Sequence, residues 1–274
     1  MAETMDLDAY FKRIGYNGPR TATLETLRAV HLHHPQAIPF ENLDCLLRIP
    51  VRLDLAAIQD KLIVRRRGGY CFEQNGLLAE ALQALGFRVT QLAARVVWGA
   101  PGDAVRPRTH KLLKLDFDSG PFIADVGFGG AVLTTPLRLE PDVVQETSHG
   151  TFRLVGDEHR YSSQVRIHDE WRTLYHFNLE PQLPPDYEMA NWYVSTWPPS
   201  HFRSELMVAR ISGDATLALR NSQLSTYRGG RLSEQRQMGD AFELRVTLEE
   251  VFGLTLPDSP ELGAVLSRAV ARPL

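Results

Sequence analysis

The first third of the chain has the spacing of amphipathic helices. Between residues 6 and 85, apolar side chains recur every three or four positions and so lie on one face of a helix. The last of these segments carries the strongest apolar stripe and ends at Gly86, a residue type that closes helices. Pro35 is expected to end the second helix. Helices are predicted over residues 6–16, 23–34, 55–63 and 70–85.

After Gly86 the pattern changes to alternating or continuous apolar runs, which are typical of β-strands. Turn residues separate these runs, notably at residues 118–120 and 156–157. Five strands in about 80 residues predict an antiparallel sheet or a small barrel. The strands are predicted over residues 87–98, 111–117, 122–126, 151–155 and 164–168.

The remainder of the chain mixes short helices with strands. Helices are predicted over residues 186–193, 248–251 and 262–270. Strands are predicted over residues 206–211, 216–219, 223–227 and 242–246. Neither an internal repeat nor a low-complexity segment is present in the sequence. The pattern as a whole indicates an α+β protein in which helices lead and strands follow.

Composition restricts the class of protein further. The 274 residues are 43% hydrophobic and 23% charged, with a net charge of −3, as in an ordinary soluble globular protein. This charge gives no basic surface for nucleic acid or an anionic membrane. Two cysteines are too few for a disulfide framework or a zinc site built on thiolates. Without a signal-like N-terminus or an apolar run long enough to span a bilayer, we expect a cytoplasmic protein.

Cys71 stands at the first turn of the helix predicted over residues 70–85, and this helix directly follows Gly68 and Gly69. A helix N-terminus favours a thiolate, because it offers unpaired N–H groups and a partial positive charge. The two glycines let the backbone turn tightly, as a nucleophile presented to a cleft requires. Cys71 is therefore a candidate nucleophile, with a buried structural thiol as the alternative. Cys45, within an apolar segment, is assigned that structural role.

A nucleophilic cysteine needs a base, and the base needs a group that orients it. His110 begins a predicted strand, and Asp125 lies inside the apolar strand 122–126, where an unpaired carboxylate is costly to bury. The two residues are 15 positions apart with a turn between them, so we expect them on adjacent antiparallel strands. That placement allows an imidazole–carboxylate hydrogen bond. The alternatives are a surface histidine at a strand edge and an aspartate that accepts a backbone N–H.

Five segments together resemble the arylamine N-acetyltransferase family, and they occur in the family's order. The nucleophile segment is RGGYCFEQN at residues 67–75. The others are IPFENL at 38–43, Thr109-His110 at the start of a strand, DVGFG at 125–129, and NWYVST at 191–196 followed by SHF at 200–202. The resemblance extends over residues 5–255.

The resemblance implies an α+β fold in three domains. These are an N-terminal helical bundle (residues 1–87), a central antiparallel β-barrel (88–190) and a C-terminal α/β lid joined by a linker helix (191–274). It also implies a Cys-His-Asp core like that of cysteine proteases and transglutaminases. The implied catalytic residues are Cys71 as nucleophile, His110 as base and Asp125 as the group that orients the imidazole.

The implied reaction is a ping-pong transfer. Acetyl-CoA acetylates the cysteine, CoA leaves, and an arylamine, arylhydrazine or N-hydroxyarylamine takes the acetyl group. Acetyl-CoA is then a cosubstrate, with no permanent cofactor and no metal, in a monomer or homodimer. The resemblance nominates Phe40, Val97, Phe128 and Phe202 for binding the acceptor. It nominates Thr109, Gly127 and Gly129 for binding CoA.

Three alternatives share the same residues. A Cys-His-Asp site also suits hydrolysis or transamidation at a peptide bond, or an amide synthase that acts on a carrier-bound acyl chain. A catalytically idle binding domain is the third, and the intact Cys71, His110 and Asp125 argue against it.

Two short motifs receive structural interpretations. The HLHH segment at residues 31–34 is expected at the end of a helix, where histidine complements the helix dipole, and not at a metal. The basic run 65–67 is expected to pair with carboxylates such as Glu41 or Glu73, with the approach of CoA phosphates as the alternative.

Overall fold

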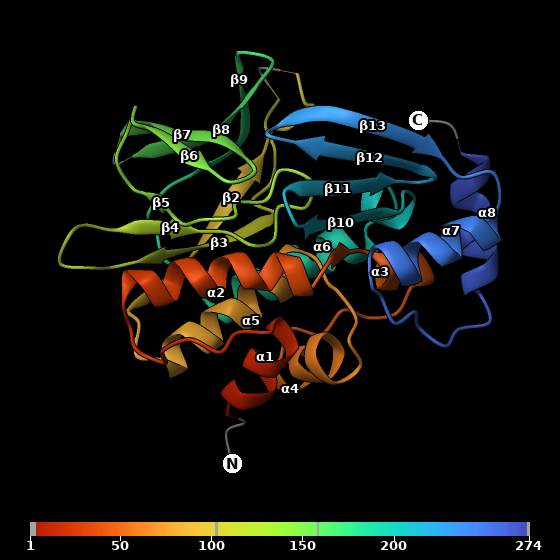
Figure 1. Cartoon of the computed structure of the whole chain (residues 1–274), viewed down its shortest axis with the longest axis horizontal. Helices are drawn as coiled ribbons and strands as arrows, with labels where there is room; N and C mark the ends of the chain where they lie inside the picture. The colour runs from red at the N-terminus through yellow and green to blue at the C-terminus, as the bar shows by residue number, and fades with distance from the viewer. Residues whose placement is uncertain (1–3, 102–103, 158, 273–274) are drawn as a thin grey trace.

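The computed structural model describes residues 4–101, 104–157 and 159–272. Figure 1 shows three regions, with the N-terminal helices on one side of two antiparallel sheets. The eight-stranded sheet lies over one end of these helices, and the five-stranded sheet lies beside it toward the C-terminus. This arrangement confirms the predicted α+β fold. No helix in the described ranges is long and apolar enough to cross a membrane.

The N-terminal helices begin where polar side chains cap their free N–H groups. Asp6 accepts from the N–H of Ala9 at 2.9 Å, and Asp54 accepts from the N–H of Ala57 at 3.1 Å. The helices are α1 (Leu7–Ile14), α2 (Leu24–Ala37), α3 (Leu43–Leu47), α4 (Leu55–Gln59), η1 (Asp60–Val64) and α5 (Cys71–Ala84). The expected stop at Pro35 is wrong, because α2 continues through this buried proline to Ala37.

Helix α5 is the centre of the first core. Its apolar stripe, from Leu77 to Leu82, is buried against α1 and α2 and against the underside of strand β3 (His110–Leu115). Each fully buried leucine in such a core contributes about 1.5–3 kcal/mol relative to an exposed one. The packing fixes the position of α5, and therefore of its first residue, Cys71.

The eight-stranded sheet is a nearly closed antiparallel barrel with strand order β5-β4-β3-β2-β9-β8-β7-β6. The two edge strands, β5 and β6, have no backbone hydrogen bonds to each other among the described residues, and a side chain links them instead. Gln145 of β6 accepts from the N–H of Arg138 in β5 at 2.8 Å and donates to the Arg138 carbonyl at 3.0 Å. The remaining strands are β2 (Val89–Val96), β4 (Phe122–Ala124), β5 (Leu137–Arg138), β6 (Val144–Thr147), β7 (Gly150–Asp157), β8 (Arg160–Ile167) and β9 (Glu170–Phe177).

The five-stranded sheet has the order β1-β10-β11-β12-β13. Its first strand, β1 (Phe40–Glu41), comes from the helical part of the chain, so the sheet joins the two ends of the sequence. The other elements of this region are α6 (Pro184–Thr196), η2 (His201–Arg203), β10 (Met207–Ser212), β11 (Ala215–Arg220), β12 (Gln223–Arg228), β13 (Arg231–Gln237), α7 (Ala241–Val246), η3 (Thr247–Val251) and α8 (Leu262–Ala271). The predicted domain boundary after residue 190 falls inside α6.

Three local predictions were wrong for identifiable reasons. The segment 242–246 is helical and not a strand, because Asp240 caps α7 by accepting from the N–H of Glu243 at 2.8 Å. Strand β13 was missed, since all seven of its residues are exposed and show no apolar alternation. Gly156 and Asp157, expected in a turn, belong to β7.

Candidate active site

Cys71 is the first residue of α5 and is only 4% exposed. The chain reaches it through a turn that leaves no room for side chains. A Cβ at Gly68 would lie 2.1 Å from the carbonyl oxygen of Pro39, and one at Gly69 would lie 2.7 Å from Oε2 of Glu73. Only glycine fits at position 68, where the obstacle is backbone, and a side chain at position 69 would displace the Glu73 carboxylate. The Cys71 thiol, which follows this turn, lies 3.6 Å from the carbonyl oxygen of Thr109.

A network of buried ion pairs stabilises the turn that precedes Cys71. Arg67 pairs with Glu41 and Asp44, each at 2.7 Å, and Lys61 pairs with Asp44 at 2.6 Å and with Glu73 at 2.7 Å. The predicted pairing of the basic run with Glu41 is confirmed, whereas Glu73 has Lys61 as its partner. Removal of one member of such a network leaves an uncompensated buried charge, at a cost of about 3–5 kcal/mol.

His110 and Asp125 meet above this helix. His110 Nε2 and Asp125 Oδ2 are 2.7 Å apart, and both side chains are almost fully buried. The two residues are brought together by the antiparallel pairing of β3 with β4, as the spacing predicted. The expectation that Asp125 lies inside the strand is wrong, because β4 ends at Ala124. Asp125 instead begins the following turn, where Gly127 donates its N–H to Asp125 Oδ1 at 3.0 Å.

The two groups stabilise each other's charged forms. Burial alone lowers the pKa of His110, but the carboxylate of Asp125 outweighs it and raises the pKa to about 10. The Cys71 thiol is close enough to add to the increase. Burial raises the pKa of Asp125, yet His110 and the donors around the carboxylate hold it below its usual value. His110 is therefore an imidazolium at neutral pH, paired with an ionised Asp125.

Asn75 links the helix that carries Cys71 to the aspartate. Its Nδ2 donates to Asp125 Oδ1 at 2.9 Å and to the Lys111 carbonyl at 2.6 Å, and its Oδ1 accepts from the N–H of Val126 at 2.9 Å. Asn75 lies four residues after Cys71 in α5, so it projects from the same face of the helix. Asn75 closes the 67–75 motif, but no pattern in the sequence pointed to this role.

Helix α2 extends three residues beyond the HLHH segment, so only His34 lies in its last turn. The helix-dipole interpretation is corrected, because His31 and His34 are buried and hydrogen-bonded to neighbouring elements. The N–H of Asp125 donates to His31 Nε2 at 3.1 Å. His34 Nδ1 is 2.8 Å from the Tyr10 hydroxyl, and its Nε2 is 2.6 Å from Gln74 Oε1. Across the described residues, no group of three His, Cys, Asp or Glu side chains is arranged to hold a metal ion.

The nominated acceptor residues fall into three places. The rings of Phe40 and Phe202 are 6.4 Å apart and pack against the apolar cluster that contains Cys71. Phe128 stands edge-on to the His110 ring at 5.3 Å. Val97 is separate from this group and lines a pocket on the outside of the barrel.

Of the three residues nominated for CoA binding, Thr109 and Gly127 lie against Cys71. The Thr109 carbonyl faces Cys71, as described above. A Cβ at Gly127 would lie 2.7 Å from Cys71 Cα, so this glycine allows the two backbones to touch. Gly129 has a φ of +80° and lies against the Phe40 ring. None of these contacts by itself identifies a CoA-binding residue.

Known proteins are similar to this chain over most of its length. The family model described as N-acetyltransferase matches residues 23–260. The chain is 43% identical to an arylamine N-acetyltransferase of Escherichia coli, over 92% of this chain and 90% of that one. It is 42% identical to an arylamine N-acetyltransferase / N-hydroxyarylamine O-acetyltransferase of Salmonella typhimurium, over 96% of both chains.

Solved structures of the same kind of enzyme share the fold of this chain. The structure of Mycobacterium marinum arylamine N-acetyltransferase in complex with CoA superposes with a TM-score of 0.92 at 41% identity, covering 97% of this chain and 99% of that one. Fold and relatives together define an acyltransferase. The chain belongs to the arylamine N-acetyltransferase family, which confirms the resemblance found in the sequence.

Proposed function

We propose that the protein transfers an acetyl group from acetyl-CoA to arylamines, arylhydrazines or N-hydroxyarylamines through an acetyl-cysteine at Cys71. The observation that carries this proposal is the buried His110–Asp125 pair next to a thiol at a helix N-terminus. The names of the Salmonella relative and of the CoA-bound structure support the two substrate classes. Both cysteines are free, which fits a reducing cytoplasm, and we propose a monomer or homodimer there.

In the first half-reaction, the Cys71 thiolate attacks the thioester carbon of acetyl-CoA. The bond from that carbon to the CoA sulfur breaks, and the leaving sulfur takes the proton of the His110 imidazolium. The products are acetyl-Cys71, free CoA and a neutral imidazole. The backbone N–H of Cys71, at the start of α5, is our candidate donor to the oxyanion of the tetrahedral intermediate.

In the second half-reaction, the acceptor nitrogen attacks the acetyl carbon, or the hydroxylamine oxygen does so in an O-transfer. His110 accepts the proton of the acceptor, the carbon–sulfur bond breaks, and the thiolate–imidazolium pair is restored. Asp125 stabilises the imidazolium at the beginning and end of the cycle, because its carboxylate is held ionised by its hydrogen bonds. Asn75 and Gly127 keep the carboxylate oriented.

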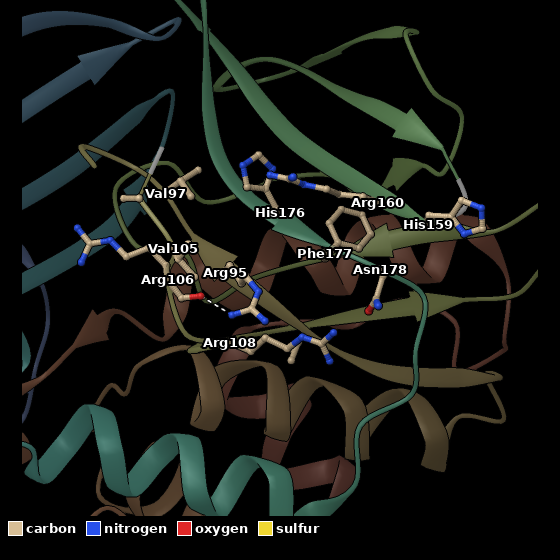
Figure 2. A pocket seen from close by; sticks show the side chains of 12 residues that line it. Arg95, Val97, Val105, Arg106, Arg108, His159, Arg160, His176, Phe177 and Asn178 are labelled. Carbon is tan, nitrogen blue, oxygen red and sulfur yellow. Dashed lines mark hydrogen bonds between the residues drawn. The ribbon is translucent and has the colours of Figure 1, made fainter. Parts of the chain in front are cut away.

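The aromatic side chains suit an aryl acceptor and exclude water from the acetyl-enzyme. Phe202 packs against both Phe40 and Tyr70, with ring centroids 6.4 Å and 5.5 Å apart. Phe128 covers the face of the site at His110. We propose Phe40, Phe128 and Phe202 as acceptor contacts, and Thr109, Gly127 and Gly129 as contacts of the CoA arm. Val97, nominated with them, lines a separate pocket on the outside of the barrel (Figure 2). Acetyl-CoA acts as a cosubstrate that departs after the first half-reaction.

The proposal is tested by initial rates at several fixed concentrations of an arylamine while acetyl-CoA is varied. Ping-pong transfer predicts parallel double-reciprocal lines. Cys71→Ser should abolish transfer, while Cys45→Ser, a buried thiol whose pKa is raised by burial, should keep most of it. Intersecting lines would indicate direct transfer in a ternary complex and would contradict the acetyl-cysteine. Cleavage or transamidation of a peptide without acetyl transfer would favour the alternative hydrolase or amide-forming enzymes.

A further inference from the structure

Lys111 is a buried lysine without a carboxylate partner. It directly follows His110 in β3 and is 7% exposed, the same as Lys61. Lys61 pairs with two carboxylates, at 2.6 and 2.7 Å, whereas Lys111 Nζ has no ion pair and no hydrogen bond within the described part of the chain. A buried ammonium without such a partner is costly, because it has lost its water. A charged Lys111 therefore depends on the other groups around it.

An aromatic ring and helix α5 surround the ammonium. Lys111 Nζ lies 4.4 Å from the centre of the Tyr187 ring, which belongs to α6. A Cβ at Gly76 of α5 would lie 3.7 Å from the same nitrogen, so the ammonium lies close to the helix. The Tyr187 hydroxyl donates to the Leu92 carbonyl at 3.0 Å, and burial raises the pKa of this phenol, which stays neutral. The ring stabilises the cation through its π-face but brings no negative charge.

Two groups on α5 supply negative charge near Lys111. Burial lowers the pKa of Lys111 to about 8, and the charges of Glu80 and of the Cys71 thiolate oppose this decrease. Glu80 is half-buried, so water screens its charge. Cys71 packs with Tyr187 and with Ala93, the register partner of Lys111 in β2, in one apolar cluster where charges are less screened. The interaction is mutual, so the ammonium also favours the thiolate.

With Lys111 included, the buried charges of the site cancel in both halves of the proposed reaction. Before transfer, the Cys71 thiolate and the Asp125 carboxylate face the His110 imidazolium and the Lys111 ammonium. In the acetyl-enzyme the sulfur is part of a neutral thioester and the imidazole has given up its proton, which leaves one carboxylate and one ammonium. Without Lys111, both states would carry one uncompensated negative charge among buried groups.

We propose that Lys111 is a positioning residue, whose buried ammonium balances the negative charge of the site and so favours Cys71 as the thiolate. His110 remains the group that exchanges the proton, and Lys111 acts on the site through its charge alone. The inference rests on the proposed function for the acetyl-transfer step only, because a thiolate can be measured without any acetyl donor.

The reaction of Cys71 with iodoacetamide tests this role, since the thiolate is the form that is alkylated. Rates for the wild-type protein and for Lys111→Met are measured across pH 4–9, and the alkylated peptide is identified by mass. Methionine fills a similar volume without charge, so the variant should keep its fold, which thermal unfolding verifies. We expect the acid limb of the rate profile to move to higher pH by about one unit, the effect of one neighbouring charge. Lys111→Arg keeps the charge and should reverse most of this movement.

The matched control is Lys114→Met, which removes a lysine from the same strand, where it pairs with Asp116. It should leave the acid limb in place. An unmoved limb in folded Lys111→Met, or an equal movement in Lys114→Met, would overturn the role of Lys111. A limb that moves only in Lys111→Met, in a protein that transfers no acetyl group, would support this role and contradict the proposed function instead.

A reciprocal measurement leaves the lysine unchanged. The chain has only four lysines, so the Cε signal of Lys111 can be followed by NMR in protein labelled with ¹³C-lysine. Removing the thiolate in Cys71→Ser should lower the pH at which Lys111 titrates by about one unit, because the two charges favour each other equally. An unchanged titration of Lys111 would overturn the proposal, and this holds even where Lys111→Met does not fold.

Discussion

Two buried histidines contact the same aspartate through different groups, and one is positively charged while the other is neutral. His110 faces the carboxylate of Asp125, and its pKa is raised to about 10. His31 faces the backbone N–H of Asp125, and burial lowers its pKa to about 3. Both side chains are almost completely hidden from solvent. Burial by itself makes an imidazole neutral, and only a carboxylate at hydrogen-bond distance reverses that outcome.

The hydrogen bonds also fix which nitrogen of each neutral ring carries the proton. Because His31 Nε2 accepts from Asp125, its proton is on Nδ1, which has no hydrogen-bond partner among the described residues. An unpaired buried N–H costs about 1–3 kcal/mol. In His34, by contrast, Nδ1 accepts from the Tyr10 hydroxyl and Nε2 donates to Gln74. Helix α2 therefore supports the active site at His31 at some cost to stability.

The largest expected effect comes from removing the negative charge of the Asp125 carboxylate. In Asp125→Asn, His110 loses the partner that raises its pKa, so the imidazole becomes neutral at pH 7 and is free to adopt the wrong tautomer. We expect kcat/KM for acetyl transfer to fall about 10³- to 10⁴-fold, as in other triads that lose their carboxylate. Rates measured across pH 5–10, with circular dichroism to verify folding, check this. A rate within tenfold of the wild type would remove Asp125 from the mechanism.

A smaller effect is expected from removing His31, the acceptor of the Asp125 backbone N–H. His31→Leu leaves the N–H of Asp125 unpaired, which should destabilise the fold by about 2 kcal/mol and shift the carboxylate enough to reduce kcat about tenfold. His31→Gln offers an oxygen acceptor at similar reach and should restore part of both losses. The pH profile of kcat/KM should stay in place in both variants, because the His110–Asp125 pair is intact. A displaced profile would mean that His31 acts on the charge of His110 and not on the position of Asp125.

The smallest effect on the catalytic rate is expected from the titration of buried histidines, which acts on stability in acid. The pKa values of His31 and His34 are lowered by burial to about 3 and about 4, below the unfolded value of 6.5. Their contribution to stability is therefore complete above pH 6.5 and is lost as the pH falls toward 4, at about 1.4 kcal/mol per pH unit for each histidine. His110 has the opposite sign, since its contribution is present below pH 6.5 and is lost as the pH rises through about 10.

Urea unfolding at pH 7, 6 and 5 measures the acid effect. His34→Gln should lower stability at pH 7 but flatten its decline with falling pH, because one of the two neutral imidazoles is gone. The same slope in the variant and the wild type would show that His34 does not titrate on unfolding.

The sequence pointed to the proposed catalytic residues more readily than to the residues packed around them. Cys71, His110 and Asp125 could be found because each breaks a local pattern or stands at the start of an element. His31 and Asn75 could not be assigned their roles, since those roles depend on helices α2 and α5 meeting the turn after β4. Such contacts between distant segments leave no periodic signal in the sequence.

The same distinction applies to the fold. Most of the helices, most barrel strands and the overall α+β class followed from periodicity, because burial on one face repeats along each element. Strand β1, with only two residues, pairs with β10 more than 160 positions away, and no local pattern could reveal it. Prediction also failed at Pro35 and at 242–246, where tertiary packing and a capping aspartate decided the local conformation.

The central claim, an acetyl group carried by Cys71, is tested most directly by intact-protein mass after brief exposure to acetyl-CoA without an acceptor. The account predicts one added acetyl group, located by peptide mapping on the peptide that contains Cys71 and removed when an arylamine or hydrazine is added. An acetyl group on Cys45 or on a lysine, or an adduct that an arylamine does not discharge, would contradict it.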